Sequence, residues 1–240
     1  MHTILEKLPL RVAICSTSNQ LSQTTLKERD LQINRDRTEE FIINRQTHEW
    51  RKCRYLGSML DTHEDIKRRK TLSINAAINL NATIFNNKKL SIQTKMSAFR
   101  TYIEPVFLYN CELWSITISQ TENIINSFQR RLLRSFVLNV RWPEVATNAE
   151  VYHRTEAKRW SETIRLRRLR WLGKALRDDN DTPMKKALQY ANGQYQRPRG
   201  KPATTWLSVV KNDLKLMNLT WDEAIEIAKD SKQWETIISH

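Results

Sequence analysis

Glycine is scarce in this chain, and its scarcity limits the folds that the chain can adopt. Four of the 240 residues are glycine, whereas glycine makes up about 7% of an average sequence. Tight hairpin turns and phosphate-binding loops need glycine, because it adopts positive φ angles without a steric cost. Gly-rich nucleotide loops and most all-β folds are therefore excluded, and a helix-rich protein is expected.

Apolar residues repeat at helical spacing over most of the chain. Hydrophobic residues make up 40% of the sequence and charged residues 28%, so wholesale disorder is not expected. The spacing predicts helices over residues 62–86, 92–102, 119–141, 161–177, 205–217 and from 220 onward. Capping boxes are predicted at residues 62–65, 119–122 and 220–223. Pro105 and Pro143 are predicted to end the helices before them.

β-structure is predicted only near the N-terminus. Short apolar runs at residues 10–15, 40–44 and 53–56 have the length and composition of strands, and Gly57 ends the third run. The expected fold class is therefore mainly α with a small β portion (α+β).

The sequence shows no feature of a membrane or secreted protein. The mean hydropathy is −0.63, no apolar run reaches the roughly 18 residues of a membrane span, and a secretory signal is not expected. Cys15, Cys53 and Cys111 provide no disulfide framework, and the five histidines lack zinc-binding spacing. We therefore expect an intracellular protein, in the nucleus or the cytoplasm, without a metal site.

Positive charge is the strongest functional signal in the sequence. Forty Lys and Arg residues stand against 26 Asp and Glu residues, which gives a formal charge of +14. Lys and Arg side chains release counterions when they contact nucleic-acid phosphates. RNA, DNA or an RNA–DNA hybrid is therefore the expected partner, and a small-molecule substrate is not expected. The alternative interpretation is an ordinary solvated charged face.

Cations at three places are predicted to contact nucleic acid. They lie on one helix (Arg130, Arg131 and Arg134), along a stripe of the most basic helix (Arg167, Arg170, Lys174 and Arg177) and in a loop between two prolines (Arg197, Arg199 and Lys201). We expect the stripe to face solvent. Arg165 and Arg168 fall instead within the apolar arc of the most basic helix, where each guanidinium needs a carboxylate, carbonyl or phosphate partner.

Two other groups of residues are expected to have structural roles rather than to bind a metal ion or nucleic-acid bases. Carboxylates at Asp178, Asp179 and Asp181 are of the type that holds Mg²⁺, but no strand would fix them in place, so a solvated loop is the favoured interpretation. The tryptophans at apolar helix positions are expected in the core rather than beneath nucleic-acid bases; they are Trp171, Trp206, Trp221 and Trp234.

A series of short motifs follows a characteristic order along the chain. They are LQIN (31–34), RTE (37–39), YLGS (55–58), DIKRR (65–69), YIEP (102–105), LYNCELW (108–114), QRRLLR (129–134), RRLRWLG (167–173) and RPRGKP (197–202). In this order they resemble the C-terminal part of the reverse transcriptases of non-LTR (LINE-type) retrotransposons, often labelled endonuclease-reverse transcriptases. The resemblance covers nearly the whole chain from about Leu10.

The resemblance implies three regions. Residues 1–60 would be a residual palm segment, with Tyr55, Leu56 and Gly57 in a primer-grip-like strand. Residues 61–145 would be the helical thumb, which holds the template-primer duplex in that family. Residues 146–240 would be a basic helical C-terminal region.

The chain departs from that family where catalysis would occur. The family carries an aspartate pair just before a strand like residues 12–17, and Leu10 and Arg11 occupy those positions here. Arg37 stands where the family usually has Lys. Because polymerases hold two metal ions with carboxylates, no catalytic residue is expected in this chain, and Mg²⁺ is expected only if another polypeptide supplies the palm.

Three functions are compatible with these observations. The favoured function is that of a truncated reverse transcriptase remnant that binds nucleic acid without catalysis. The second is a part of an RNA-directed DNA polymerase whose catalytic palm is supplied elsewhere. The third is a helical protein-interaction module with an acidic partner. The sequence does not indicate the oligomeric state.

Overall fold

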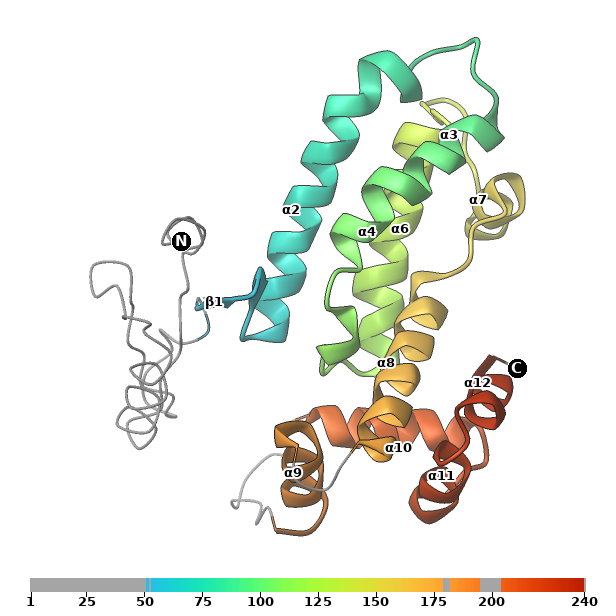
Figure 1. Cartoon of the computed structure of the whole chain (residues 1–240). Coiled ribbons are helices and arrows are strands. Elements are labelled where there is room, and N and C mark those ends of the chain that lie inside the picture. Colours follow the sequence, from blue (N-terminus) through green and yellow to red (C-terminus); the bar gives the residue numbers. More distant parts are fainter. Residues whose placement is uncertain (1–50, 52, 179–181, 195–203, 240) are drawn as a thin grey trace, which may run out of the picture. The chain divides into compact units, whose positions relative to one another are not determined.

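The computed structural model describes residues 51, 53–178, 182–194 and 204–239. Helices dominate these residues (Figure 1), which confirms the expected fold class. The strands predicted at 10–15 and 40–44 lie outside the described residues. The chain divides into two compact units, 1–69 and 70–240. The three regions that the resemblance implies stay a prediction.

A short hairpin opens the described part of the first unit. β1 (Arg54–Tyr55) pairs with β2 (Ser58–Met59) in antiparallel orientation. Leu56 and Gly57 form the turn and have positive φ angles of 46° and 86°, as a two-residue hairpin turn requires. The strand predicted at 53–56 is therefore shorter than expected, and the second strand was not predicted.

Asp61 caps the start of α2 (Thr62–Leu80). Its Oδ1 accepts hydrogen bonds from two backbone N–H groups of the first helical turn, at 2.9 and 3.1 Å. The capping box predicted at 62–65 is therefore wrong. Asp65 instead accepts a hydrogen bond from the backbone N–H of Met59 at 2.9 Å and lies 3.6 Å from the Nε of Arg69, which ties the hairpin to the helix.

Two long helical segments form the first half of the second unit. Residues 92–107 comprise α3 (Ile92–Ala98), η5 (Phe99–Ile103) and α4 (Glu104–Phe107). Residues 118–137 comprise α5 (Ile118–Gln120), η7 (Thr121–Asn126), α6 (Ser127–Leu132) and η8 (Leu133–Val137). η5, η7 and η8 are π-helical, as is η4 (Asn81–Phe85) after α2, whereas η6 (Cys111–Leu113) is a 3-10 turn.

Two ends of these segments differ from the predictions. Pro105 does not end the first segment. It follows directly on the π-helical residues of η5, where the usual i→i−4 hydrogen-bond pattern is already interrupted. Thr117 caps the second segment: its Oγ1 accepts a hydrogen bond from the Gln120 N–H at 3.2 Å, and the Gln120 Oε1 accepts one from the Thr117 N–H at 3.0 Å. The capping box therefore lies two residues before the predicted one.

Shorter helices surround one long helix in the rest of the unit. They are α7 (Asn148–Thr155), α8 (Trp160–Arg177), α9 (Pro183–Gln189), the π-helical η9 (Tyr190–Gln194), α10 (Trp206–Leu216), α11 (Trp221–Ala228) and α12 (Ser231–Ser239). The bounds of α8 and α10 agree with the predicted helices to within one residue, and the capping box at Thr220 is confirmed. No helix within the described ranges is long and apolar enough to cross a membrane.

The long helix α8 runs from the helices α4 and α6 to the helices α10, α11 and α12 (Figure 1). It contributes side chains to an apolar cluster at each end. At its N-terminal end, Trp160 stacks on Phe107 with 4.4 Å between the ring centroids, and its Nε1 donates a hydrogen bond to Glu104 at 2.9 Å. At its C-terminal end, Leu172 is buried with residues of α10, α11 and α12, among them Trp234. α8 is therefore fixed at both ends.

Gly173 allows α12 to lie directly against α8. A Cβ atom at this position would lie 2.2 Å from the Nε1 of Trp234. That Nε1 donates a hydrogen bond to the carbonyl oxygen of Leu169 at 3.0 Å, and the tryptophan is 1% exposed. The predicted core position of Trp234 is confirmed, while Trp171 and Trp206 are half-buried and pack edge to face at 4.9 Å.

Candidate nucleic-acid interface

Two arginines of the predicted stripe bind backbone carbonyl groups. The Nη1 of Arg167 donates a hydrogen bond to the Leu108 carbonyl oxygen at 2.8 Å, just after α4 ends. The Nη1 of Arg177 donates to the carbonyl oxygen of Ala228, the last residue of α11, at 3.0 Å. Helix C-termini favour cations because their last carbonyl groups have no intrahelical partner. These two side chains hold neighbouring helices against α8.

The other two members of the stripe differ from each other. Arg170 forms a two-point contact with the carboxylate of Glu235 on α12, with its Nε at 2.9 and 3.1 Å from the two oxygens. Lys174 is exposed, and its ammonium group makes no ion pair with any residue in the described part of the chain. Three members of the stripe are exposed, as expected, and Arg167 is half-buried. Helices distant in the sequence nevertheless supply partners to three of the four members.

The arginines predicted on the 118–137 segment are also partly engaged. Arg130 forms an ion pair with Glu122 at 2.6 Å. Arg134 donates a hydrogen bond to the Oδ1 of Asn148 at 2.7 Å and another to a backbone carbonyl. Arg131 is exposed. Of these three residues, Arg131 alone presents its charge to solvent without such a contact.

The remaining predicted residues lie in two other places. Arg197, Arg199 and Lys201 lie outside the described residues. The primer-grip-like residues form the tip of the hairpin in the first unit, where Tyr55 and Leu56 are exposed and the neighbouring Gly57 completes the turn. Their role stays a prediction.

Buried amides fix the N-terminus of α8. Gln129 accepts a hydrogen bond from the Trp160 N–H at 3.1 Å and donates one to the Lys158 carbonyl oxygen at 2.7 Å. Asn126 accepts a hydrogen bond from the Ser161 N–H at 3.0 Å. The first N–H groups of α8 thus have internal partners. A ligand at this helix end would therefore contact the surrounding side chains rather than the backbone.

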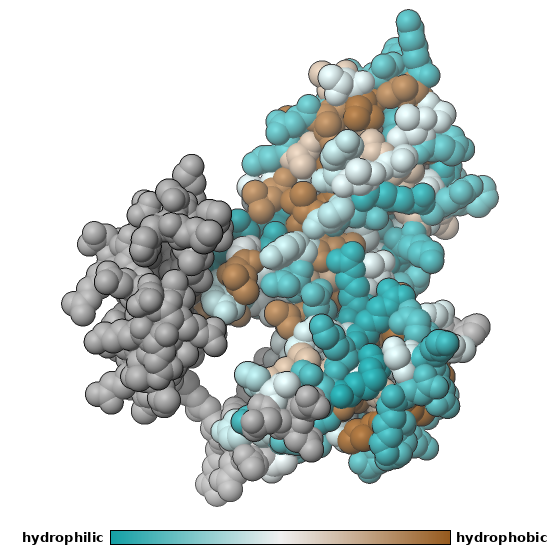
Figure 2. Space-filling model, viewed as in Figure 1, coloured by the Kyte–Doolittle hydropathy of each residue, from teal (hydrophilic) through white to brown (hydrophobic). Residues whose placement is uncertain are grey.

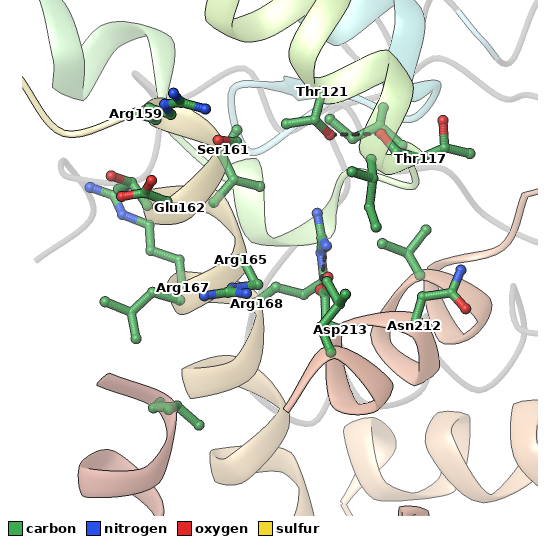
Figure 3. Close-up of a pocket in the computed structure, with 18 of the residues that line it drawn as sticks. Thr117, Thr121, Arg159, Ser161, Glu162, Arg165, Arg167, Arg168, Asn212 and Asp213 are labelled. Atoms are coloured by element: carbon green, nitrogen blue, oxygen red, sulfur yellow. Dashed lines mark hydrogen bonds and ion pairs between the residues drawn. The ribbon is translucent and has the colours of Figure 1, made fainter. Parts of the chain in front are cut away.

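A groove of about 1170 Å³ lies between α8, the start of the 118–137 segment and α10 (Figure 3). Six Lys or Arg residues and three Asp or Glu residues line it, so its walls carry an excess of positive charge. Hydrophilic residues also lie over the region where Figure 1 places α8 (Figure 2). The groove is therefore suited to an anionic ligand.

Arg168 and Asp213 form an ion pair in the wall of this groove. The Nη1 of Arg168 lies 2.6 Å from the Oδ2 of Asp213, and both side chains are almost fully buried. The prediction that Arg168 needs a partner is confirmed. Burial raises the pKa of Asp213, although the positive charges of Arg168 and Arg165 oppose that shift. The Nε of Arg168 has no hydrogen-bond partner among the described residues.

Arg165 lies beside this pair and has no counterion of its own. It is half-buried in the groove lining, and it forms neither a hydrogen bond nor an ion pair with any residue that the structure describes. Its positive charge acts on the carboxylate of Asp213, which Arg168 already binds. Arg165 therefore has its hydrogen-bond donors available for an anion.

Two further cations stand at the same end of α8. Lys158 and Arg159 are exposed and line the groove. The guanidinium of Arg159 lies 5.5 Å from the centre of the Tyr152 ring, a contact that orients the side chain without neutralising it. Together with Arg165, they form the set that we call the groove cations: Lys158, Arg159 and Arg165.

The described residues show neither a cluster of metal ligands nor, at Cys111, an activated thiol. No group of three or more His, Cys, Asp or Glu residues in these ranges could hold a metal ion. Asp179 and Asp181 lie outside the described residues, so the loop interpretation of that acidic run stays a prediction. Burial raises the pKa of Cys111 to about 12, so its thiolate is scarcely populated near neutral pH.

No protein-family model, curated protein or solved structure matches this chain. The resemblance to LINE-type reverse transcriptases therefore stays a prediction from the order of motifs. The groove cations were not among the residues predicted for the interface. The available signal was the place of Arg165 in the apolar arc of α8, where a guanidinium needs an oxygen partner.

Proposed function

We propose that this chain binds nucleic acid without catalysing a reaction on it, as a remnant of a LINE-type reverse transcriptase. The observation that carries the proposal is the set of groove cations, which have no ion pair within the described structure and line a groove with excess positive charge. The partners would be RNA, DNA or a hybrid of the two, in the nucleus or the cytoplasm.

The half-buried position of Arg165 supports this proposal over an ordinary solvated face. A guanidinium that is partly withdrawn from water loses hydration, and an oxyanion compensates for that loss best, because charge-assisted hydrogen bonds are strong. Phosphate groups provide such oxygens. The formal charge of +14 for the whole chain would attract a polyanion from a distance.

A second candidate function is a protein-interaction module. The loop before α7 exposes two apolar side chains, Trp142 at 91% and Val145 at 83%. Exposed aromatic residues are frequent anchors of protein interfaces. This loop carries its apolar side chains outward, whereas the groove presents an excess of positive charge. The two candidate functions therefore require partners of different chemistry.

Salt-titrated binding tests the proposal. The full chain is mixed with a labelled RNA of mixed sequence, and the binding constant is measured between about 50 and 200 mM salt. Binding through phosphates requires the logarithm of the binding constant to fall linearly with the logarithm of the salt concentration, and the fall should be alike for unrelated sequences. Absence of binding, or an affinity that does not change with salt, would contradict the proposal.

A further inference from the structure

We infer that the groove beside α8 binds an unpaired nucleic-acid strand, with Arg165 as its central phosphate contact. This inference rests on the proposed function and specifies the form of nucleic acid that the groove takes and the residue that binds it. Three features of the groove carry it: the depth of Arg165, the spacing of the groove cations and the composition of the opposite wall.

The depth of Arg165 favours a flexible strand over a duplex. The side chain is half-buried on the groove wall, so a ligand must enter the groove to reach it. A duplex is a stiff rod with a persistence length of about 50 nm, and its phosphates would meet outward-facing cations such as Arg131 and Lys174 first. An unpaired strand can follow the groove and place a phosphate against Arg165.

The spacing of the groove cations favours a chain of linked phosphates over a single anion. Arg159 is the N-cap of α8, and Arg165 lies six positions after it. At a rise of 1.5 Å per residue, the two positions are about 9 Å apart along the helix axis. A polyanion with repeated charges can give each of these cations a phosphate of its own, with Lys158 as a third contact at the same end, whereas one small anion provides only a single charged group.

The groove wall opposite α8 is formed by the start of the 118–137 segment, by α10 and by the residues just before α10. This wall is suited to a sugar–phosphate backbone. It presents the exposed polar side chains of Thr204 and Asn212, and hydroxyl and amide groups commonly bind phosphate and sugar oxygens. Ile118 and Leu216 are also exposed there, at 59% and 58%. None of the described residues that line the groove is aromatic, so strong base stacking and a marked sequence preference are not expected.

The buried ion pair keeps Arg165 available. The carboxylate of Asp213 is held at 2.6 Å by Arg168, so the neighbouring Arg165 does not gain it as a counterion. The labelled side chains in Figure 3 show these residues together on the groove wall. Arg168 and Asp213 therefore act as positioning residues, and Arg165 is the group that would contact the ligand.

Two variants and one control test the inference in the full chain. Arg165→Gln removes the central contact, and Asn212→Trp fills the groove without changing the charge. Lys174→Gln is the control, because it removes one exposed cation from the same helix outside the groove. Binding is measured with labelled oligo(dT) as the unpaired strand and with a DNA hairpin duplex, and thermal melting verifies the fold of each variant.

The expected result is a selective loss of binding to the unpaired strand. Arg165→Gln should weaken oligo(dT) binding about tenfold, as expected for the loss of a charge-assisted hydrogen bond, and should lower the salt slope by about 0.7. Asn212→Trp should also weaken oligo(dT) binding. Lys174→Gln should have a smaller effect on oligo(dT), and duplex binding should change little with Arg165→Gln.

Other outcomes separate the inference from the proposed function. If both groove variants bind oligo(dT) as tightly as Lys174→Gln while the wild type keeps salt-dependent binding, the groove is not the site and the proposed function stands. If the wild type binds neither of these probes nor the labelled RNA, the proposed function itself fails. If poly-glutamate displaces oligo(dT) at equal charge concentration, the groove takes an acidic peptide instead. Should Arg165→Gln unfold, Arg165→Lys must retain oligo(dT) binding.

Discussion

Arg168 on α8 and Asp213 on α10 form a buried ion pair, with 2.6 Å between Nη1 and Oδ2 and exposures of 3% and 4%. The pair joins two helices that line the groove. Burial of two charges brings little net stability, because the loss of hydration offsets their attraction. Breaking the pair is different, since it leaves one charge buried without its partner.

Asp213→Ala is therefore expected to lower the free energy of unfolding by about 3–5 kcal/mol. Replacing both residues with apolar ones, Arg168→Met with Asp213→Leu, should cost much less, because no unpaired charge remains. Urea unfolding of the two variants and the wild type measures both values. Equal losses in the single and the double variant would show that the pair does not act as described.

Gly173→Ala is expected to destabilise the chain by about 1–3 kcal/mol, the usual cost of overpacking. The new methyl group would lie 2.2 Å from the Trp234 ring, which would have to leave α8. Gly193→Ala is the matched control, because no atom lies within 4 Å of a Cβ at that position. Thermal melting and tryptophan fluorescence check the result, and equal melting temperatures for the two variants would contradict the packing.

Glu122 should contribute a small acid-sensitive part of the stability. Hydrogen bonds from Asn126 and Arg130 hold its pKa below the ordinary value of 4.5. A depressed pKa stabilises the folded chain above 4.5, and this stability is lost as the pH falls through the folded-state pKa. Thermal melting from neutral pH to below 4.5 should show a steeper loss for the wild type than for Glu122→Gln. Parallel profiles would contradict the assignment.

The chain alone should not extend a primer. Leu10 and Arg11 stand where the resembling reverse transcriptases carry metal-binding aspartates, and polymerisation requires carboxylates that hold two metal ions. The purified chain is incubated with an RNA template, a DNA primer, Mg²⁺ and deoxynucleotides, and an active reverse transcriptase serves as the positive control. Primer extension that persists through further purification would contradict this prediction.

Sequence periodicity predicted the longer helices well but did not predict α7 or α9, and it did not predict the partners of exposed side chains. The spacing of apolar residues predicted α8 to within one residue, because that pattern reflects local helical geometry. It treated α8 as an isolated helix, however. Arg170 and Arg177 find their partners in α12 and α11, more than 50 residues away in sequence, and no local pattern contains such contacts.

Local capping signals did not predict helix starts to the exact residue. Ser, Thr and Asp residues stand at neighbouring positions before several helices, and the sequence does not decide which of them caps. Thr117 caps the 118–137 segment in place of Ser119.

Arg165 shows what the sequence could reveal about the site. Its place in an apolar arc indicated an unusual environment, whereas its free guanidinium became evident only from the folded structure.

The most direct measurement compares the salt dependence of oligo(dT) binding in two triple variants. One replaces the groove cations Lys158, Arg159 and Arg165 with Gln, and the other replaces the engaged arginines Arg167, Arg170 and Arg177 with Gln. At about 0.7 per phosphate contact, the first variant should lower the salt slope by about 2 and keep its melting temperature. The second should keep the slope but melt at a lower temperature, because its side chains hold neighbouring helices. An unchanged slope in the first variant with a reduced slope in the second would contradict the assignment of nucleic-acid binding to the groove.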